Sequence, residues 1–106
     1  MEKYSVVITD DAKQDLADIY NYISIDLSSP VYAANQLTRI KESIISLGEF
    51  PKRYKTLELE IDGKKDIRRM PVDNYNVLYK IDDNRVVVLY ILYSASDINH
   101  RLKSKK

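Results

Sequence analysis

The hydrophobic positions of the first half of the chain recur with a helical period. Apolar residues fall three or four positions apart in two stretches, which predict helices at about 10–27 and 30–47, the second ending at Gly48. Ser29 and Pro30 between them suit the cap and the first turn of a helix. The short break predicts an antiparallel helical hairpin. The two apolar stripes are Ala12, Leu16, Ile19, Tyr20 and Ile23, then Ala33, Leu37, Ile40, Ile44 and Leu47.

The second half alternates with the period of two that is typical of strands. One of its expected strands, residues 85–93, is apolar on both faces and should be internal to the sheet. The order of elements predicts an α+β fold, with an N-terminal strand and an antiparallel helical hairpin packed on a twisted antiparallel sheet of three to five strands. Strands are expected at 3–8, 65–70, 75–81 and 85–93, with a further possible strand at 57–61, and turns at 71–74 and 82–84.

Length and composition exclude several classes of protein. The 106 residues fit one domain, 1–106, and no apolar run approaches the ~20 residues of a membrane span. The start lacks the apolar region of a signal peptide, so we expect a cytoplasmic protein with no membrane partner. The chain has no cysteine, one histidine and two glycines. Thiol catalysis, a multi-histidine metal site and a phosphate-binding glycine loop are therefore not expected, and we predict no cofactor and no metal.

Charge is distributed unevenly along the chain. Residues 1–50 contain eight acids and four bases, whereas residues 51–106 contain eight acids and thirteen bases. This asymmetry is consistent with a nucleic-acid or acidic-protein partner for the second half, or with a solvated basic surface.

Four segments together carry a family resemblance. In chain order they are ITDDAKQDLADIYNYI, SPVYAANQLTRIKESIISLGEFPKRY, IRRMPVDNYNVLYKI and VVVLYILYSASDINHRL. This series resembles the RelE/ParE toxin superfamily of bacterial type II toxin–antitoxin systems, which includes plasmid stabilisation proteins. The long helical hairpin is more similar to the ParE branch than to the compact RelE nucleases.

The resemblance implies a growth-arresting toxin held by a cognate antitoxin in a hetero-oligomer. ParE-like members resemble inhibitors that bind DNA gyrase and need no hydrolytic residues. RelE-like members cut messenger RNA inside the ribosome. A third possibility is a non-toxic relic that only binds an antitoxin. The resemblance therefore leaves DNA gyrase and the ribosome with its messenger RNA as alternative targets.

Site residues follow from the same resemblance. The cationic strand position of the family corresponds to Arg68 and Arg69. Two further family arginines correspond to Asn76 and to Ala95 or Ser96, which are neutral and cannot replace a cation at a phosphate. This favours the ParE-like function over the nuclease. If the chain is nonetheless a nuclease, Arg68, Arg69 and His100 are the expected catalytic residues.

As binding residues we predict Arg68, Arg69, Tyr93, Lys52 and Arg53. Neighbouring strand residues point to opposite faces, so at most one of the two strand arginines can serve a given site. We expect Arg68 or Arg69 to lie beside Tyr93 and residues 94–100, forming a cationic patch with an aromatic floor. Residues 101–106 are expected to be a mobile basic tail.

Overall fold

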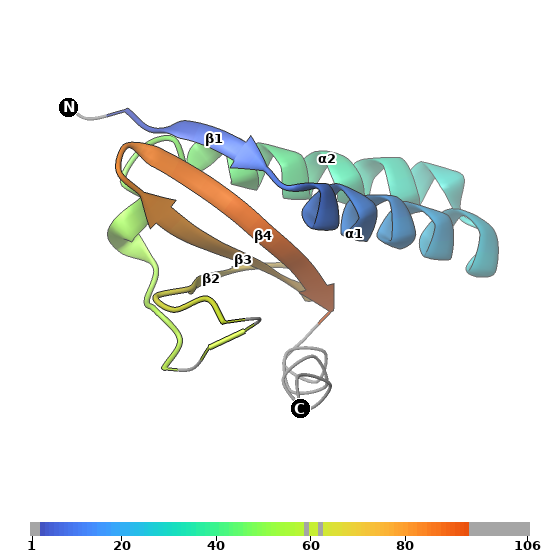
Figure 1. Cartoon of the computed structure of the whole chain (residues 1–106). Coiled ribbons are helices and arrows are strands. Elements are labelled where there is room, and N and C mark those ends of the chain that lie inside the picture. The colour runs from blue at the N-terminus through green and yellow to red at the C-terminus, as the bar shows by residue number, and fades with distance from the viewer. Residues whose placement is uncertain (1–2, 59, 62, 94–106) are drawn as a thin grey trace.

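The chain folds as a helical hairpin over a four-stranded sheet (Figure 1). The computed structural model describes residues 3–58, 60–61 and 63–93. The fold class predicted from the sequence is confirmed. Its elements are strand β1 (Ser5–Ile8), helix α1 (Asp10–Asn21), a π-helical turn (Tyr22–Asp26), helix α2 (Pro30–Ser46), a 3-10 turn (Pro51–Arg53), and strands β2 (Arg68–Val72), β3 (Tyr75–Asp82) and β4 (Arg85–Tyr93).

The helices begin where their capping residues indicate. Thr9 precedes α1, and its Oγ1 accepts a hydrogen bond from the amide of Ala12 at 3.2 Å. Pro30 opens α2, although Ser29 makes no side-chain capping bond. The helix predicted at 10–27 is thus α1 continued by the π-helical turn. No helix in the described part of the chain is long and apolar enough to cross a membrane.

The strand order is β1-β4-β3-β2, so β4 is internal as predicted. The sheet is mixed rather than antiparallel throughout, because β1 pairs with β4 in parallel. The hairpin explains this direction. Helix α2 brings the chain back to the end of the sheet where β1 begins, and the amide of Tyr4 donates to the carbonyl of Gly48 at 2.8 Å. Strands β2 and β4 then run in the same direction as β1.

The strands expected at 65–70 and at 57–61 differ from the structure. The first begins only at Arg68. Pro71 and Val72 belong to β2, so the turn to β3 contains only Asp73 and Asn74. Asp73 has φ 56°, a left-handed conformation that aspartate tolerates better than most residues. The described residues of 57–61 form no strand. The side chains of Leu57 and Ile61 instead pack against the face of the sheet that lies away from the helices.

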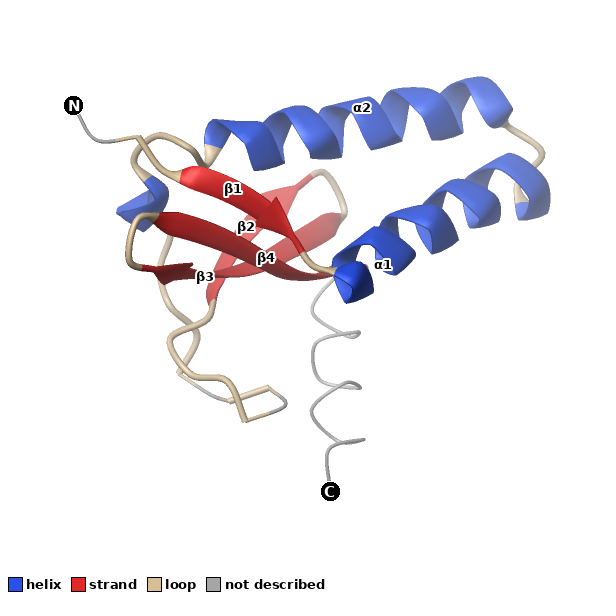
Figure 2. Ribbon diagram, turned by 45° about the horizontal axis from the view of Figure 1, so that its top comes forward, coloured by secondary structure: helices blue, strands red, loops and turns tan. Residues whose placement is uncertain are grey.

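Both faces of the sheet are covered by apolar side chains. The hairpin buries one face, where Ile40 and Ile44 of α2 pack with Val77 and Tyr79 of β3. Figure 2 shows that the hairpin extends past the end of the sheet. Tyr20, which the sequence placed in the core stripe, is 40% exposed and lies outside this core.

Strand β4 is apolar on both faces because both faces of the sheet are covered, and a bulge shifts its alternation. Val88 pairs with Tyr79, whereas Tyr90 pairs with Leu78, so Leu89 is an extra residue. Before the bulge, Val88 packs on the helix side. After it, the parity changes, so that Ile91 packs toward the helices and Leu92 packs away from them.

Candidate functional site

The two arginines of β2 lie on opposite faces and have different surroundings. Arg68 shares the helix-covered face with Met70, and its Nη1 donates to the carbonyls of Tyr54 at 2.5 Å and Lys52 at 3.3 Å. It therefore ties the loop before β2 to the sheet. Arg69 pairs with Leu78 on the opposite face and is exposed. Its guanidinium makes no hydrogen bond or ion pair with any other described residue.

The prediction that Arg68 or Arg69 lies beside Tyr93 is wrong. Both β2 and β4 are antiparallel to β3, so they run in the same direction. Arg68 aligns through Tyr79 with Val88, which precedes Tyr93 by five positions, or roughly 17 Å of strand. The arginines stand at the start of β2, whereas Tyr93 ends β4, at the opposite end of the sheet. Ala95, Ser96, His100, the rest of 94–100 and the tail 101–106 lie outside the described residues.

Lys52 and Arg53 belong to the 3-10 turn after α2. Arg53 donates through Nη1 to the carbonyls of Glu49 and Phe50 at 2.5 and 3.0 Å, and through Nη2 to Ser46 Oγ at 3.0 Å. Its guanidinium also lies 5.0 Å from the ring centroid of Tyr54. Arg53 thus stabilises the C-terminal end of α2. Lys52 is exposed, and a binding function for either side chain stays a prediction.

Asn76 occupies the position that corresponds to a family arginine. It lies in β3 between Pro71 and Leu92, with only 6% of its surface exposed. A neutral, buried amide at this position places no positive charge on the face of the sheet away from the helices.

Tyr93 lines a cleft of about 570 Å³ between the far end of the hairpin and the ends of β3 and β4. We call it the tyrosine cleft, because Tyr22, Tyr32, Tyr75 and Tyr93 all line it. The rings of Tyr75 and Tyr93 meet edge to face, with centroids 5.5 Å apart. Burial raises the pKa of the Tyr75 hydroxyl above its usual value.

Two carboxylates of α1 line the wall of this cleft. Asp15 Oδ2 accepts the backbone amide of Ile91 at 2.9 Å, which connects α1 to β4. Asp18 lines the cleft one turn further along and accepts a hydrogen bond from Gln14 at 2.9 Å. No lysine or arginine is among the described residues that line the cleft.

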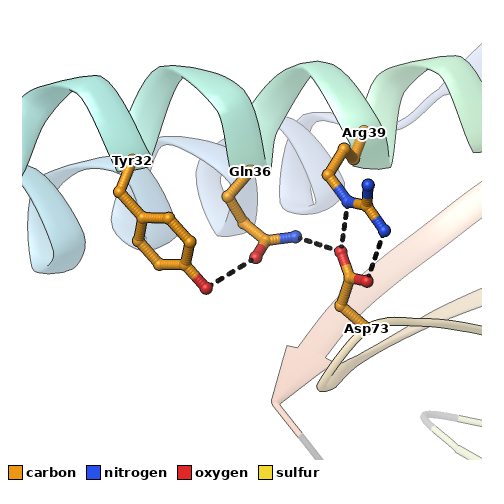
Figure 3. A network of polar contacts seen from close by, with 4 residues as sticks. All are labelled: Tyr32, Gln36, Arg39 and Asp73. Atoms are coloured by element: carbon orange, nitrogen blue, oxygen red, sulfur yellow. Dashed lines mark hydrogen bonds and ion pairs between the residues drawn. The ribbon is translucent and has the colours of Figure 1, made fainter.

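A polar network connects α2 to the turn between β2 and β3 (Figure 3). Two of its residues, Tyr32 and Gln36, also line the cleft. Asp73 accepts two hydrogen bonds of 2.7 Å from Arg39 and one of 2.9 Å from Gln36 Nε2. The hydroxyl of Tyr32 donates to Gln36 Oε1 at 3.4 Å. The bonds from Arg39 and Gln36 lower the pKa of Asp73 to about 2. The network therefore holds Gln36 and Tyr32, two residues of the cleft wall, in a defined orientation.

Next to the cleft, the end of the hairpin exposes an apolar surface. Ile25 is 69% exposed and Val31 is 74% exposed. Exposed apolar patches of this kind mark interaction sites in soluble proteins. We call this patch the tip surface, and it consists of Tyr22, Ile25, Leu27, Val31 and Tyr32.

Sequence reasoning identified only Tyr93 among the residues of the cleft. The other three tyrosines, the two aspartates and Gln36 were not singled out. One signal was available. Ile25, Leu27 and Val31 are large apolar residues that fall outside both predicted stripes, at the turn of the hairpin. Apolar residues off the core face of a hairpin indicate a surface that something else covers.

Comparison with known families gives one match over most of the chain. The family described as "ParE toxin of type II toxin-antitoxin system, parDE" matches residues 6–98. No curated protein matches the chain at a significant level.

Several solved structures share the fold. The chromosomal ParDE toxin–antitoxin system from P. aeruginosa aligns with a TM-score of 0.72 at 19% identity, covering 87% of this chain and 97% of that one. The toxin–antitoxin complex RelBE2 from Mycobacterium tuberculosis aligns with a TM-score of 0.65 at 26% identity, covering 90% of this chain and 95% of that one. A mutant of the E. coli toxin RelE in the free state aligns with a TM-score of 0.58 at 13% identity, covering 96% and 97%.

Proposed function

Since the chain belongs to the ParE toxin family of type II toxin–antitoxin systems, we propose that it arrests bacterial growth by binding a protein target such as DNA gyrase, and that a cognate antitoxin neutralises it. The solved P. aeruginosa and M. tuberculosis relatives are a ParDE system and a RelBE2 toxin–antitoxin complex. An antitoxin partner for this chain is the corresponding expectation.

The observation that carries the proposal is the tip surface beside the tyrosine cleft. Ile25 and Val31 are more than two-thirds exposed, and aromatic rings surround the neighbouring hollow. Interfaces between proteins are enriched in aromatic residues at their centres, and a few such residues supply most of the binding energy. A toxin that works by binding needs such a surface and no hydrolytic group.

A ribosome-dependent ribonuclease is the second candidate, and one observation favours it. Arg69 presents a guanidinium, which pairs with none of the other described residues, on the face of the sheet away from the helices, and such a group can bind a phosphate with two hydrogen bonds. The neutral Asn76 weakens this alternative, because preorganised charge at a reacting phosphate supplies a few kcal/mol of transition-state stabilisation.

Inducing the chain in a bacterial host, with and without the product of a neighbouring antitoxin gene, tests the proposal. We expect growth to stop without that product and to continue with it, and the two proteins to co-purify. Cell extracts should show inhibited DNA supercoiling and intact messenger RNA. The control variant Arg69→Ala should arrest growth to the same extent as the parent.

The other outcomes identify the competing functions. Messenger RNA cut at ribosome-bound sites, together with loss of toxicity in Arg69→Ala, would indicate the ribonuclease. Antitoxin binding without any effect on growth would indicate a non-toxic antitoxin-binding relic.

A further inference from the structure

We propose that the tyrosine cleft binds an arginine or lysine side chain that the antitoxin presents on an otherwise apolar segment. The inference rests on the proposed function for its partner, and on the aromatic lining, charge and surroundings of the cleft for its chemistry.

The aromatic lining suits a cation. Four tyrosines line the cleft, and a guanidinium or ammonium group is attracted to the face of such a ring within about 6 Å of its centroid. The same chemistry already operates elsewhere in this chain, where Arg53 lies 5.0 Å from the ring centroid of Tyr54. Tyr75 and Tyr93 hold each other edge to face, which orients two of the rings at the end of the sheet.

The charges around the cleft also favour a positive occupant. From Asp10 to Asp26 the chain carries five aspartates and one lysine, and Asp15 and Asp18 line the cleft itself. Arg39, on the neighbouring face of α2, is engaged by both oxygens of Asp73. A carboxylate entering the cleft would meet like charge on the wall, whereas a cation would meet a compensating one.

The surroundings determine what flanks that cation. The cleft opens beside the tip surface, where Ile25 and Leu27 are exposed by 69% and 52%. A segment lying across both would place apolar side chains on the tip and one long basic side chain in the hollow. The aliphatic part of that side chain would contact Ile19 and Ile91 of the lining while its charged group reaches Asp18.

The first experiment uses the toxin–antitoxin complex. Each lysine and arginine of the antitoxin is replaced by methionine, and each variant is paired with Asp18→Asn in a double-mutant cycle. We expect Asp18→Asn to weaken the affinity of the complex by about 10-fold. For one antitoxin lysine or arginine, replacement by methionine should then change the affinity much less in the Asp18→Asn background than in the parent. Glu42→Gln, an equal change of charge at an exposed position outside the lining, should change the affinity less than twofold.

The second experiment uses the chain alone, with N-acetylarginine methylamide as the probe and N-acetylglutamine methylamide as its neutral counterpart. We expect the NMR ring signals of the four cleft tyrosines to shift saturably with the arginine probe, weakly in Asp18→Asn, and not with the glutamine probe. Equal shifts with the arginine and glutamine probes would overturn the cation site. Additive effects of Asp18→Asn and every antitoxin substitution, in a complex that still forms, would also overturn it, while the proposed function stands. If the arginine probe binds but the chain forms no complex with the antitoxin, the cation site is supported and the antitoxin is ruled out as its partner.

Discussion

Adjacent side chains on β2 differ in what they contribute to the protein. Arg68 turns toward the hairpin side and donates to two carbonyls of the preceding loop, whereas Arg69 turns away and is exposed. Sequence position does not distinguish them, but the pleat of the strand does. The first ties the preceding loop to the sheet, and the second is the more exposed of the two.

We therefore expect single alanine variants of the two arginines to differ in stability. Arg68→Ala should lower the free energy of unfolding by about 1–3 kcal/mol, because the carbonyls of Tyr54 and Lys52 lose a charged donor. Arg69→Ala should change it by less than about 0.5 kcal/mol, as for an ordinary surface substitution. Urea unfolding of both variants measures the difference, and equal losses would contradict the assignment.

The network around Asp73 gives a prediction with a definite pH dependence. An aspartate in an unfolded chain has a pKa near 3.9, and hydrogen bonds from Arg39 and Gln36 lower the folded value to about 2. Because the folded pKa is depressed, the stabilisation is present above the unfolded value and is lost as the pH falls toward about 2.

Asp73→Asn removes the charge and keeps a residue that tolerates the left-handed backbone. We expect the variant to melt at a lower temperature than the parent at neutral pH. The difference in Tm should shrink between about pH 4 and about pH 2, because protonation then removes the same charge from the parent. Thermal melts across this range measure it, and a difference that does not depend on pH would contradict the mechanism.

Among the secondary-structure elements, β4 depends on a side chain from α1. Strand β1 pairs with β4 only from Arg85 to Val88, so beyond this point the same edge of β4 needs other partners. Thr9 Oγ1 donates to the carbonyl of Val88 at 2.8 Å, and Asp15 accepts the amide of Ile91 at 2.9 Å. The carboxylate thereby replaces the next strand and fixes the end of β4, which forms one side of the cleft.

Replacing Asp15 tests whether its carboxylate takes the place of a neighbouring strand. Asp15→Ala should lower the free energy of unfolding by about 1–2 kcal/mol, because the amide of Ile91 loses its acceptor. Hydrogen exchange at that amide should accelerate more than at Val77, in the centre of the sheet. Asp18→Ala on the same helix serves as the control and should change neither quantity appreciably. Unchanged exchange at Ile91 in Asp15→Ala would contradict the interpretation.

For the molecule as a whole, the hairpin separates stability from recognition. Its half nearest the sheet buries the core, while its far end carries the tip surface past the sheet (Figure 2). The exposed apolar residues of the tip surface therefore contribute little to folding, and changing them should mainly affect binding.

A double variant at the tip surface, Ile25→Ser with Val31→Ser, should keep the stability of the parent within about 1 kcal/mol, because both side chains are already mostly in water. Its affinity for the antitoxin should fall by at least about 10-fold, as when exposed apolar anchors of an interface are lost. Ile45→Ser, also 71% exposed but near the C-terminal end of α2, is the matched control. Titration calorimetry measures the affinity of the tip variant and of the control for the antitoxin. Equal affinities for the two would contradict the interface.

The amino-acid pattern was sufficient for the elements and for the fold class. Helices and strands depend on neighbours within a few residues, so the spacing of apolar residues and the break at Pro30 indicated the hairpin, and the apolar run 85–93 indicated the internal strand. The same local information showed that Arg68 and Arg69 must point to opposite faces.

The direction and the register of the strands required the tertiary structure. The direction of β1 and the bulge at Leu89 follow from long-range packing, and the separation of Tyr93 from the arginines follows from pairing across the whole sheet. The tyrosine cleft unites α1, α2, β3 and β4, which are distant in the chain. No local pattern encodes such a meeting, because it is created when the hairpin packs against the sheet and leaves its far end uncovered.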